Sequence, residues 1–316
     1  MPAAPFLVAA AVGGSNSTAS LPASATLPAS QLTSAAGDEI DYVDVGQGDG
    51  VVMRIGGEFI VSDAGQHNVA AVDAALHQLG ATNVVDVAIL SHPHSDHVKN
   101  FLALVDNFGW TIKQVVLSRS DWWQGTATNK KLIAAMRAHG AKLVYVSAGQ
   151  HFNWGGADWE ILSPPADRYT GVGQAADASV VYVLQRRGEV FVFTGDIGKS
   201  VASAVAEHWS SEQLGRATIF LATHHGSAAG STDAILQALQ PKWAVLSTGP
   251  NAYGHPSPAA IMRLVQHGIT IWCTNANGTI RALISRTGRI SWSASKQQAP
   301  WWSATAKQET GSCVGR

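Results

Sequence analysis

The sequence predicts an α/β fold class (α+β) in which two β-sheets pack on each other with helices outside, a four-layer αββα sandwich. Three observations support this prediction. Short strand-like runs separated by glycine begin at Ile40, strands and helices then alternate along the chain, and the second half repeats the order of the first. Two such modules bury their apolar faces best when the sheets meet and the helices cover the outside.

The first module opens as a meander. Residues 40–45, 50–55 and 58–62 are strand-like runs bounded by Gly or Asp turn signals. Residues 69–79 repeat apolar positions at helical spacing and stop at Gly80, which is typical of a helix C-terminus. Residues 84–90 form a continuous apolar run of strand length, which predicts a strand buried on both faces.

The same patterns predict the remaining elements. Helices are expected at 98–105, 129–139, 199–208, 232–239 and 258–266. Strands are expected at 114–117, 141–146, 159–162, 180–185, 190–194, 218–221 and 243–246, and near Ile269, Thr279 and Arg289.

These elements predict one domain, residues 38–294, between a disordered leader (1–37) rich in Ala, Ser, Thr and Pro and a flexible tail (295–316). The apolar stretch 6–12 is shorter than the roughly 20 residues of a membrane span. No Lys or Arg precedes Arg54, so the basic start of an export signal is absent. A degenerate export signal stays as the alternative, and the chain is expected to be soluble, either cytoplasmic or exported.

Composition excludes several classes of protein. Lys plus Arg number 21, Asp plus Glu 22, and the formal net charge is -1, so the chain is neither a basic nucleic-acid coat protein nor an acidic buffer. The 2 cysteines, Cys273 and Cys313, exclude a disulfide scaffold and a cysteine-rich zinc module. Any anionic partner must therefore be attracted by a local site.

The densest chemistry lies in one short segment after the buried strand. His92, His94, Asp96 and His97 stand within six residues. Packed imidazoles repel one another when charged and are costly to desolvate, unless a cation organises them. His92 and His94 project to one side of an extended loop, while Asp96 and His97 fall at the turn into the next helix. Imidazole and carboxylate together suit zinc, and also manganese or iron.

This segment resembles the HxHxDH signature of the metallo-beta-lactamase superfamily. Further segments resemble the C-terminal domain of ComEC, the competence DNA-uptake channel, and free-standing hydrolases of that type. They are residues 44–50 (DVGQGDG), 62–65 (SDAG), 194–196 (TGD), 224–227 (HHGS) and 253–257 (YGHPS). The resemblance covers residues 40 to 290 and implies a metallo-beta-lactamase-like fold with two divalent ions, Zn²⁺ first and Mn²⁺ as an alternative.

The resemblance also implies roles for single residues. His92 and His94 would hold the first metal, Asp96 and His97 the second, and Asp196 would bridge them. The next ligand would be His224, with His225 beside it as a phosphate contact or proton donor, although the order of this pair stays open.

Asp63 resembles an aspartate that orients a ligand histidine. The superfamily's third histidine of the first metal has no counterpart between His151 and His208. Asp177, Ser179 or water would fill its place.

His255 stands in a Gly-His-Pro-Ser turn that opens a helix. A helix N-terminus attracts phosphate, and capping by Ser257 is the purely structural explanation of the same turn.

The leading functional hypothesis is a metal-dependent hydrolase, a phosphodiesterase or nuclease, because paired cations activate water and clamp both oxygens of a displacement at phosphorus. Asp96 or Asp196 would hold the attacking water, and His225 or His255 would stabilise the phosphate or protonate the leaving oxygen. The expected partner is a phosphodiester, with single-stranded DNA as one candidate. Trp122, Trp123, Trp301 and Trp302 could stack on single-stranded bases, and a place in the core or on a carbohydrate-facing surface is the equal alternative. Basic pairs occur only at 130–131 and 186–187.

Two alternatives remain, and a third, the diiron oxidoreductase, is disfavoured by the residue at position 94. The first is hydrolysis of a small or cell-wall-linked ester, such as a phosphorylcholine ester or a lactone. A diiron oxidoreductase of the same fold would carry glutamate where His94 stands. A non-catalytic metal-binding or DNA-binding module would be expected to lack ligands that are present here.

Overall fold

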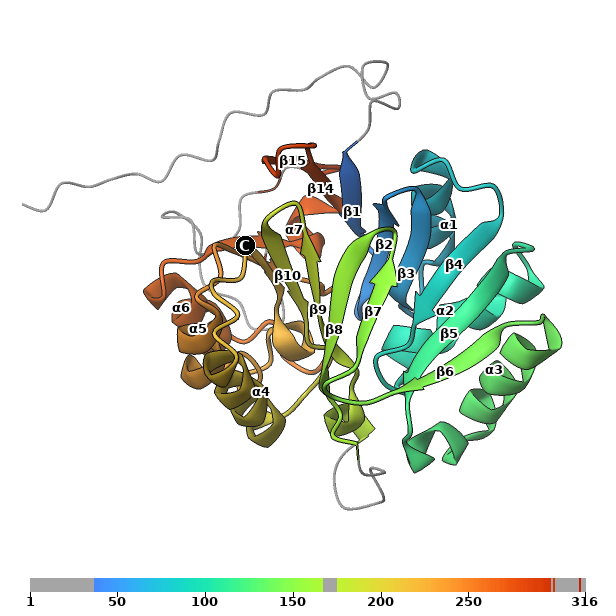
Figure 1. Cartoon of the computed structure of the whole chain (residues 1–316), viewed down its shortest axis with the longest axis horizontal. Coiled ribbons are helices and arrows are strands. Elements are labelled where there is room, and N and C mark those ends of the chain that lie inside the picture. The colour runs from blue at the N-terminus through green and yellow to red at the C-terminus, as the bar shows by residue number, and fades with distance from the viewer. Residues whose placement is uncertain (1–36, 167–174, 297, 299–312, 314–316) are drawn as a thin grey trace, which may run out of the picture.

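The computed structural model describes residues 37–166, 175–296, 298 and 313. It confirms the predicted αββα sandwich. Figure 1 shows helices α1 to α3 on one flank and α4 to α6 on the other, with both sheets between them. The predicted leader lies outside the described residues except for Gly37, and so does most of the predicted tail, including Trp301 and Trp302.

The first sheet has eight strands in the order β15-β14-β1-β2-β3-β4-β5-β6. Its strands are β1 (Asp38–Tyr42), β2 (Gly50–Ile55), β3 (Glu58–Ala64), β4 (Val84–Ile89), β5 (Thr111–Ser118), β6 (Lys142–Val146), β14 (Ile280–Ile284) and β15 (Ile290–Ala294). The meander β1-β2-β3 is antiparallel, and β3 to β6 run parallel. The carboxyl ends of β3, β4 and β5 therefore meet at one edge.

The second sheet has seven strands in the order β13-β12-β11-β10-β9-β8-β7. They are β7 (His151–Trp154), β8 (Ala157–Ser163), β9 (Val181–Arg186), β10 (Glu189–Phe193), β11 (Ile219–Leu221), β12 (Trp243–Leu246) and β13 (Thr270–Cys273). From β10 to β13 the strands are parallel. The loops after β10, β11 and β12 thus also gather at one edge.

Helices cover the outer face of each sheet. They are α1 (Val69–Gln78), α2 (Ser95–Asp106), α3 (Ala127–Ala138), α4 (Lys199–Ser211), α5 (Asp233–Leu239), α6 (Pro258–Gln266) and the short α7 (Thr274–Asn277), with single turns η2 (Asp121–Gln124), η3 (Ala175–Ala178) and η4 (Thr223–Gly226). One apolar cluster joins the first sheet to its helices, a second lies between the sheets, and a third joins the second sheet to its helices. Three buried layers account for the four-layer arrangement.

Most predicted elements lie within a few residues of the observed ones, and the short helix α7 and the turns η2 to η4 were not predicted. Strand β7 was not predicted, because its sequence HFNW has no apolar run. Helix α2 begins at Ser95, three residues before the predicted start. The earlier start places Asp96 and His97 in the first helical turn. Of the pair for which stacking and a core place were equal alternatives, Trp123 is a core residue and Trp122 is exposed.

A buried carboxylate on β1, a strand of the first sheet, forms ion pairs with two arginines at the end of β9 in the second sheet. Asp38, which is 2% exposed, accepts from Arg186 Nε at 2.8 Å and from Arg187 Nε at 2.6 Å, across the sandwich. Burial alone would raise the pKa of Asp38, but the hydrogen bonds from Arg186 and Gly56 outweigh it and lower that pKa. These two arginines are therefore engaged within the fold and are not a free phosphate-binding pair.

The two cysteines form a disulfide, Cys273–Cys313, across 40 positions of sequence. Cys313 is fully buried, and its backbone N–H donates to Asn275 Oδ1 at 3.3 Å. One point of the predicted tail is thus fixed to the end of β13. Within the described ranges, no helix is both long enough and apolar enough to cross a membrane.

Candidate metal centre

The histidine segment leaves the end of β4 and enters α2. His92 is fully buried, His94 is the extended residue that precedes the helix, and Asp96 and His97 occupy its first turn. The backbone N–H of Gly65, at the end of β3, donates to the carbonyl of His97 at 3.1 Å. The facing sheet brings Asp196 from the loop after β10 and the His224-His225 pair from the loop after β11. Residues from both halves of the chain therefore converge between the two sheets.

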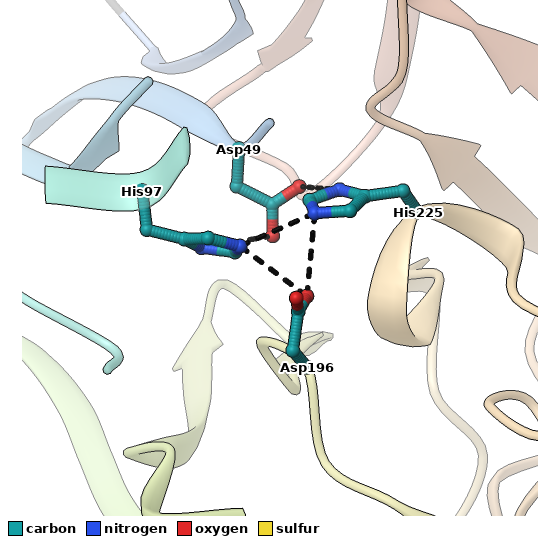
Figure 2. A group of neighbouring side chains, drawn as sticks. All are labelled: Asp49, His97, Asp196 and His225. Atoms are coloured by element: carbon teal, nitrogen blue, oxygen red, sulfur yellow. Dashed lines mark hydrogen bonds and ion pairs between the residues drawn. The ribbon is translucent and has the colours of Figure 1, made fainter. Parts of the chain in front are cut away.

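An inner group of potential ligands consists of Asp49, His97, Asp196 and His225 (Figure 2). The two Nε2 atoms of His97 and His225 lie 3.2 Å apart. Asp196 Oδ1 lies 3.3 Å from Nε2 of His97 and 3.4 Å from Nε2 of His225. Asp96 Oδ2 lies 3.5 Å from Nε2 of His225. Asp96 thus lies beside this group through His225, although it is not one of the group's four members.

The opposite edge of each imidazole is held by the protein. Nδ1 of His97 lies 2.7 Å from Asp63 Oδ2. Nδ1 of His225 lies 2.9 Å from the carbonyl of Ser247 and 3.2 Å from Asp49 Oδ1. Figure 2 shows Asp49 and Asp196 approaching the two rings from opposite sides. A neutral ring that donates through Nδ1 presents an unprotonated Nε2, so a cation that replaced the second proton of each ring would find a lone pair from both histidines at the centre of the inner group.

The second oxygen of Asp196 faces an outer group. Asp196 Oδ2 lies 3.7 Å from His92 Nε2 and 3.5 Å from His224 Nε2. The His92 and His94 rings lie 4.6 Å apart, and His92, His94 and Asp196 can place ligand atoms within 4.8 Å of one another. His224 is partly exposed at 34% of its side chain, whereas His225 is 1% exposed. Asp196 thus stands between two sets of donors.

Backbone geometry separates His224 from His225. Both have left-handed φ values, 52° and 53°, and Gly226 follows with φ 80°. Consecutive non-glycine residues in this region are uncommon and strained, and such strain concentrates at functional sites. Here it turns His225 into the interior and leaves His224 at the mouth. The structure therefore places His225, and not His224, against His97 and Asp96.

The donor sets fit divalent ions. Ligand bonds of about 2.0–2.1 Å at tetrahedral angles separate ligand atoms by about 3.3–3.4 Å. The inner contacts of 3.2, 3.3 and 3.4 Å match that spacing. Nε2 of His92 and Oδ1 of Asp196 are buried and make no hydrogen bond among the described residues, and Oδ1 of Asp196 has only its ion-pair contacts with the Nε2 atoms of His97 and His225 at 3.3 and 3.4 Å. Buried polar atoms without partners are costly, and a cation would satisfy both.

The pKa shifts of His97, His225 and Asp196 also indicate a site that attracts positive charge. Burial alone would lower the pKa values of His97 and His225, but the carboxylate of Asp196 and a second carboxylate beside each ring outweigh it and raise both well above 6.5. Burial alone would raise the pKa of Asp196, and the two imidazoliums instead hold it well below 3.8. The site thus collects positive charge, as protons or as metal ions.

The remaining predicted residues have separate places. Asp177 accepts from the backbone N–H of Gly198 at 2.7 Å and so supports the turn after Asp196. The hydroxyl of Ser179 donates to the carbonyl of Ala176 at 2.6 Å and accepts from the backbone N–H of Asp196 at 3.3 Å. Both residues position the Asp196 loop. Neither occurs in the two groups of potential ligands found in the described part of the chain.

Asp49 was missed as a site residue. The resemblance places its Gly-Gln-Gly-Asp turn near the metals, with a tight hairpin as the purely structural explanation, and the turn packs directly on α2. A Cβ on Gly48, whose φ is 128°, would lie 1.9 Å from the carbonyl oxygen of Asp96, so only glycine allows this approach. The sequence signal that could have found Asp49 was an acidic residue between two glycines, Gly48 and Gly50, in a segment that carries the resemblance.

His255 lies at the outer edge, and its ring centroid is 5.3 Å from that of His224. Its Nδ1 is buried and makes no hydrogen bond to the residues that the structure describes. Burial, with the neighbouring His224 charge, lowers the pKa of His255 to about 4. Ser257 caps α6 by accepting from the backbone N–H of Ala260 at 3.1 Å, so the capping explanation of this turn is also correct.

The chain is similar to several known proteins. The family model described as the metallo-beta-lactamase superfamily matches residues 43–249. ComE operon protein 3 of Bacillus subtilis (strain 168) is 26% identical over 262 residues, 77% of this chain and 32% of that protein. Competence protein ComA of Neisseria gonorrhoeae is 27% identical over 251 residues, 78% of this chain and 32% of that protein. The chain thus spans about a third of the length of these relatives.

Among solved structures, the metallo-beta-lactamase fold protein YhfI from Bacillus subtilis has a TM-score of 0.51 at 13% identity, covering 81% of this chain and 99% of that chain. CmlA, a diiron beta-hydroxylase from Streptomyces venezuelae, has a TM-score of 0.50 at 16% identity, covering 75% of this chain and 52% of that chain. These two likenesses concern the fold alone. The family match covers more than half of a chain whose histidines and aspartates converge at one edge of the sandwich, and the chain belongs to the metallo-beta-lactamase superfamily.

Proposed function

We propose that this protein is a metal-dependent phosphodiesterase acting on nucleic acid. The observation that carries the proposal is the position of Asp196, whose two carboxylate oxygens face two separate groups of histidines. Paired sites of this kind suit displacement at phosphorus. The relatives named as competence proteins make nucleic acid the first substrate class to test.

In this proposal the inner ion is held by His97, His225, Asp96 and Asp196. The outer ion would be held by His92, His94 and Asp196, and Nε2 of His224 lies 3.5 Å from Oδ2 of the same aspartate. Bound divalent ions, Zn²⁺ or Mn²⁺, would supply Lewis acidity and lower the pKa of water. His225 thereby takes the ligand role that was first expected of His224. It has no atom left to serve as a proton donor, because both ring nitrogens face other groups.

Asp96 is the acid best placed to accept a hydrogen bond from the attacking water. Its side chain is 19% exposed, whereas that of Asp196 is 3% exposed. Burial alone would raise its pKa, but the hydrogen bond from His225 and the charge of His97 hold that pKa below the usual range. Asp96 is therefore ionised at neutral pH.

His255 is suited to binding the phosphate rather than to protonating a leaving group. With a pKa of about 4 it is neutral at pH 7, and a neutral imidazole still donates one N–H to a phosphoryl oxygen. His224, partly exposed beside it, lines the same mouth.

The test combines metal content with activity. Purified protein is loaded with Zn²⁺ or Mn²⁺, its metal content is measured, and hydrolysis of bis-p-nitrophenyl phosphate, single-stranded DNA and a lactone is compared. We expect diester cleavage that falls at least 100-fold in Asp196→Ala and His94→Ala, with the exposed Asp106→Asn as the matched control. Cleavage of the lactone alone would favour the hydrolase of small esters over the phosphodiesterase. If metal-loaded protein cleaves none of the three substrates, the non-catalytic binding module is the remaining alternative.

A further inference from the structure

An exposed aromatic ring stands at the mouth of the metal centre. Tyr253 is 75% exposed, far more than any other large apolar side chain in the described ranges. Its ring stacks on His255, with centroids 6.1 Å apart and planes 25° from parallel. His255 in turn contacts His224, whose Nε2 lies 3.5 Å from Asp196 Oδ2. A row of three rings thus leads from the shared carboxylate to solvent.

The loop that carries Tyr253 is held by the side chain of Asn251. Its Oδ1 accepts from the backbone N–H groups of Tyr253 at 3.0 Å and His255 at 3.1 Å. Its Nδ2 donates to the carbonyl of Gly249 at 2.8 Å. Because this side chain bonds to the loop on both sides of the tyrosine, the backbone that carries the exposed ring is held in place beside His255.

The charge of the protein argues against recognition through many phosphates. The formal net charge is -1. Several cations are already paired with the protein's own carboxylates: Arg54, Lys113, Arg186, Arg187, Arg281 and Lys296. Durable duplex binding depends on many free Lys and Arg contacts. Stacking of a base on an aromatic ring contributes about 1–3 kcal/mol and needs no charge.

We propose that Tyr253 is the stacking platform for the nucleobase adjoining the scissile phosphate, so that the substrate is a single strand or an unpaired end rather than a duplex. A base inside a duplex has both faces covered by its neighbours, and only an unpaired base can offer one to Tyr253. This inference rests on the proposed phosphodiesterase function and names the substrate class of the same site.

The experiment separates binding from turnover. Metal-loaded protein is titrated, by fluorescence anisotropy, into a labelled oligothymidine strand and an abasic strand of equal length, both with cleavage-resistant phosphorothioate links. For Tyr253→Ala we expect the Kd for the thymidine strand to rise about tenfold, which is 1.4 kcal/mol. The Kd for the abasic strand should not change. Tyr253→Trp should bind the thymidine strand at least as well as the wild type, and Val265→Ala, an exposed site at the far end of α6, should match the wild type.

Equal affinities of Tyr253→Ala and wild type for the thymidine strand, or equal losses on both strands, would overturn the platform. Turnover is scored separately. If the wild type hydrolyses bis-p-nitrophenyl phosphate and Tyr253→Ala leaves strand binding intact, the phosphodiesterase stands and the platform fails. If strand binding depends on Tyr253 but no diester is cleaved, the platform stands as a binding site and the phosphodiesterase fails.

Discussion

Nδ1 of His97 lies 2.7 Å from Asp63 Oδ2, on the edge of the ring opposite the Nε2 that faces Asp196. The carboxylate of Asp63 also accepts from the backbone N–H of Ser91 at 2.9 Å and from its hydroxyl at 2.5 Å. Asp63 therefore fixes both the orientation of the His97 ring and the strand end from which the histidine segment starts.

We expect Asp63→Asn to weaken metal binding by about 10–100-fold, as loss of a carboxylate behind a ligand histidine does elsewhere. A competition titration against a chromophoric chelator measures this. Asp106→Asn, which removes a surface carboxylate paired with His139, is the matched control. An unchanged affinity in Asp63→Asn would show that the ring is held by its packing alone.

Substitution by asparagine should affect metal content differently at His224 and at His225. His225→Asn removes a donor that is 1% exposed and faces two carboxylates, so we expect the dialysed protein to lose about one equivalent of metal. His224→Asn removes a donor that is 34% exposed, and we expect weaker binding of the outer ion with the inner ion retained. Metal analysis after dialysis distinguishes the two. Equal loss in both variants would contradict the split assignment.

The stabilisation that metal provides should grow as pH rises. His97 and His225 have pKa values raised well above 6.5, so their contribution to the stability of the metal-free protein is complete below pH 6.5 and is lost as pH rises through the raised values. Metal binding needs the unprotonated rings and is favoured in the same direction.

The difference in Tm between metal-loaded and metal-free protein, measured by calorimetry from pH 6 to pH 9, should therefore increase. His97→Asn should flatten that increase. A difference that stays constant with pH in the wild type would show that the two rings are already neutral in the metal-free protein.

Asp38→Ala should be strongly destabilising. The change leaves Arg186 and Arg187 without their shared carboxylate and removes the acceptor of the backbone N–H of Gly56. Removing one partner of a buried ion pair costs about 3–5 kcal/mol. Urea denaturation measures the loss in the free energy of unfolding. Asp233→Ala, whose carboxylate is 65% exposed, should change it by less than about 1 kcal/mol, and similar losses in both variants would contradict the argument.

Much of the centre was predictable because its first half is contiguous in sequence. Four potential ligands follow one buried strand, and a second acidic strand end supplies Asp196. The choice between His224 and His225 was not predictable, because it depends on two left-handed residues in succession. The alternation of apolar and polar residues predicts strands, but it does not predict left-handed backbone angles after a strand. The place of Asp49 in the site was not predicted for a related reason. It depends on the glycine turn packing against Asp96 in three dimensions.

The link between Cys273 and Cys313 has a practical consequence. Cross-links of this kind persist in oxidising compartments and are uncommon where glutathione keeps thiols reduced. A loop of 40 residues closed in this way stabilises a fold by about 4 kcal/mol in the chain-entropy treatment. Material made in a reducing cytosol, or stored with dithiothreitol, would then melt earlier than the oxidised form, and enzyme assays on the two preparations would not be comparable.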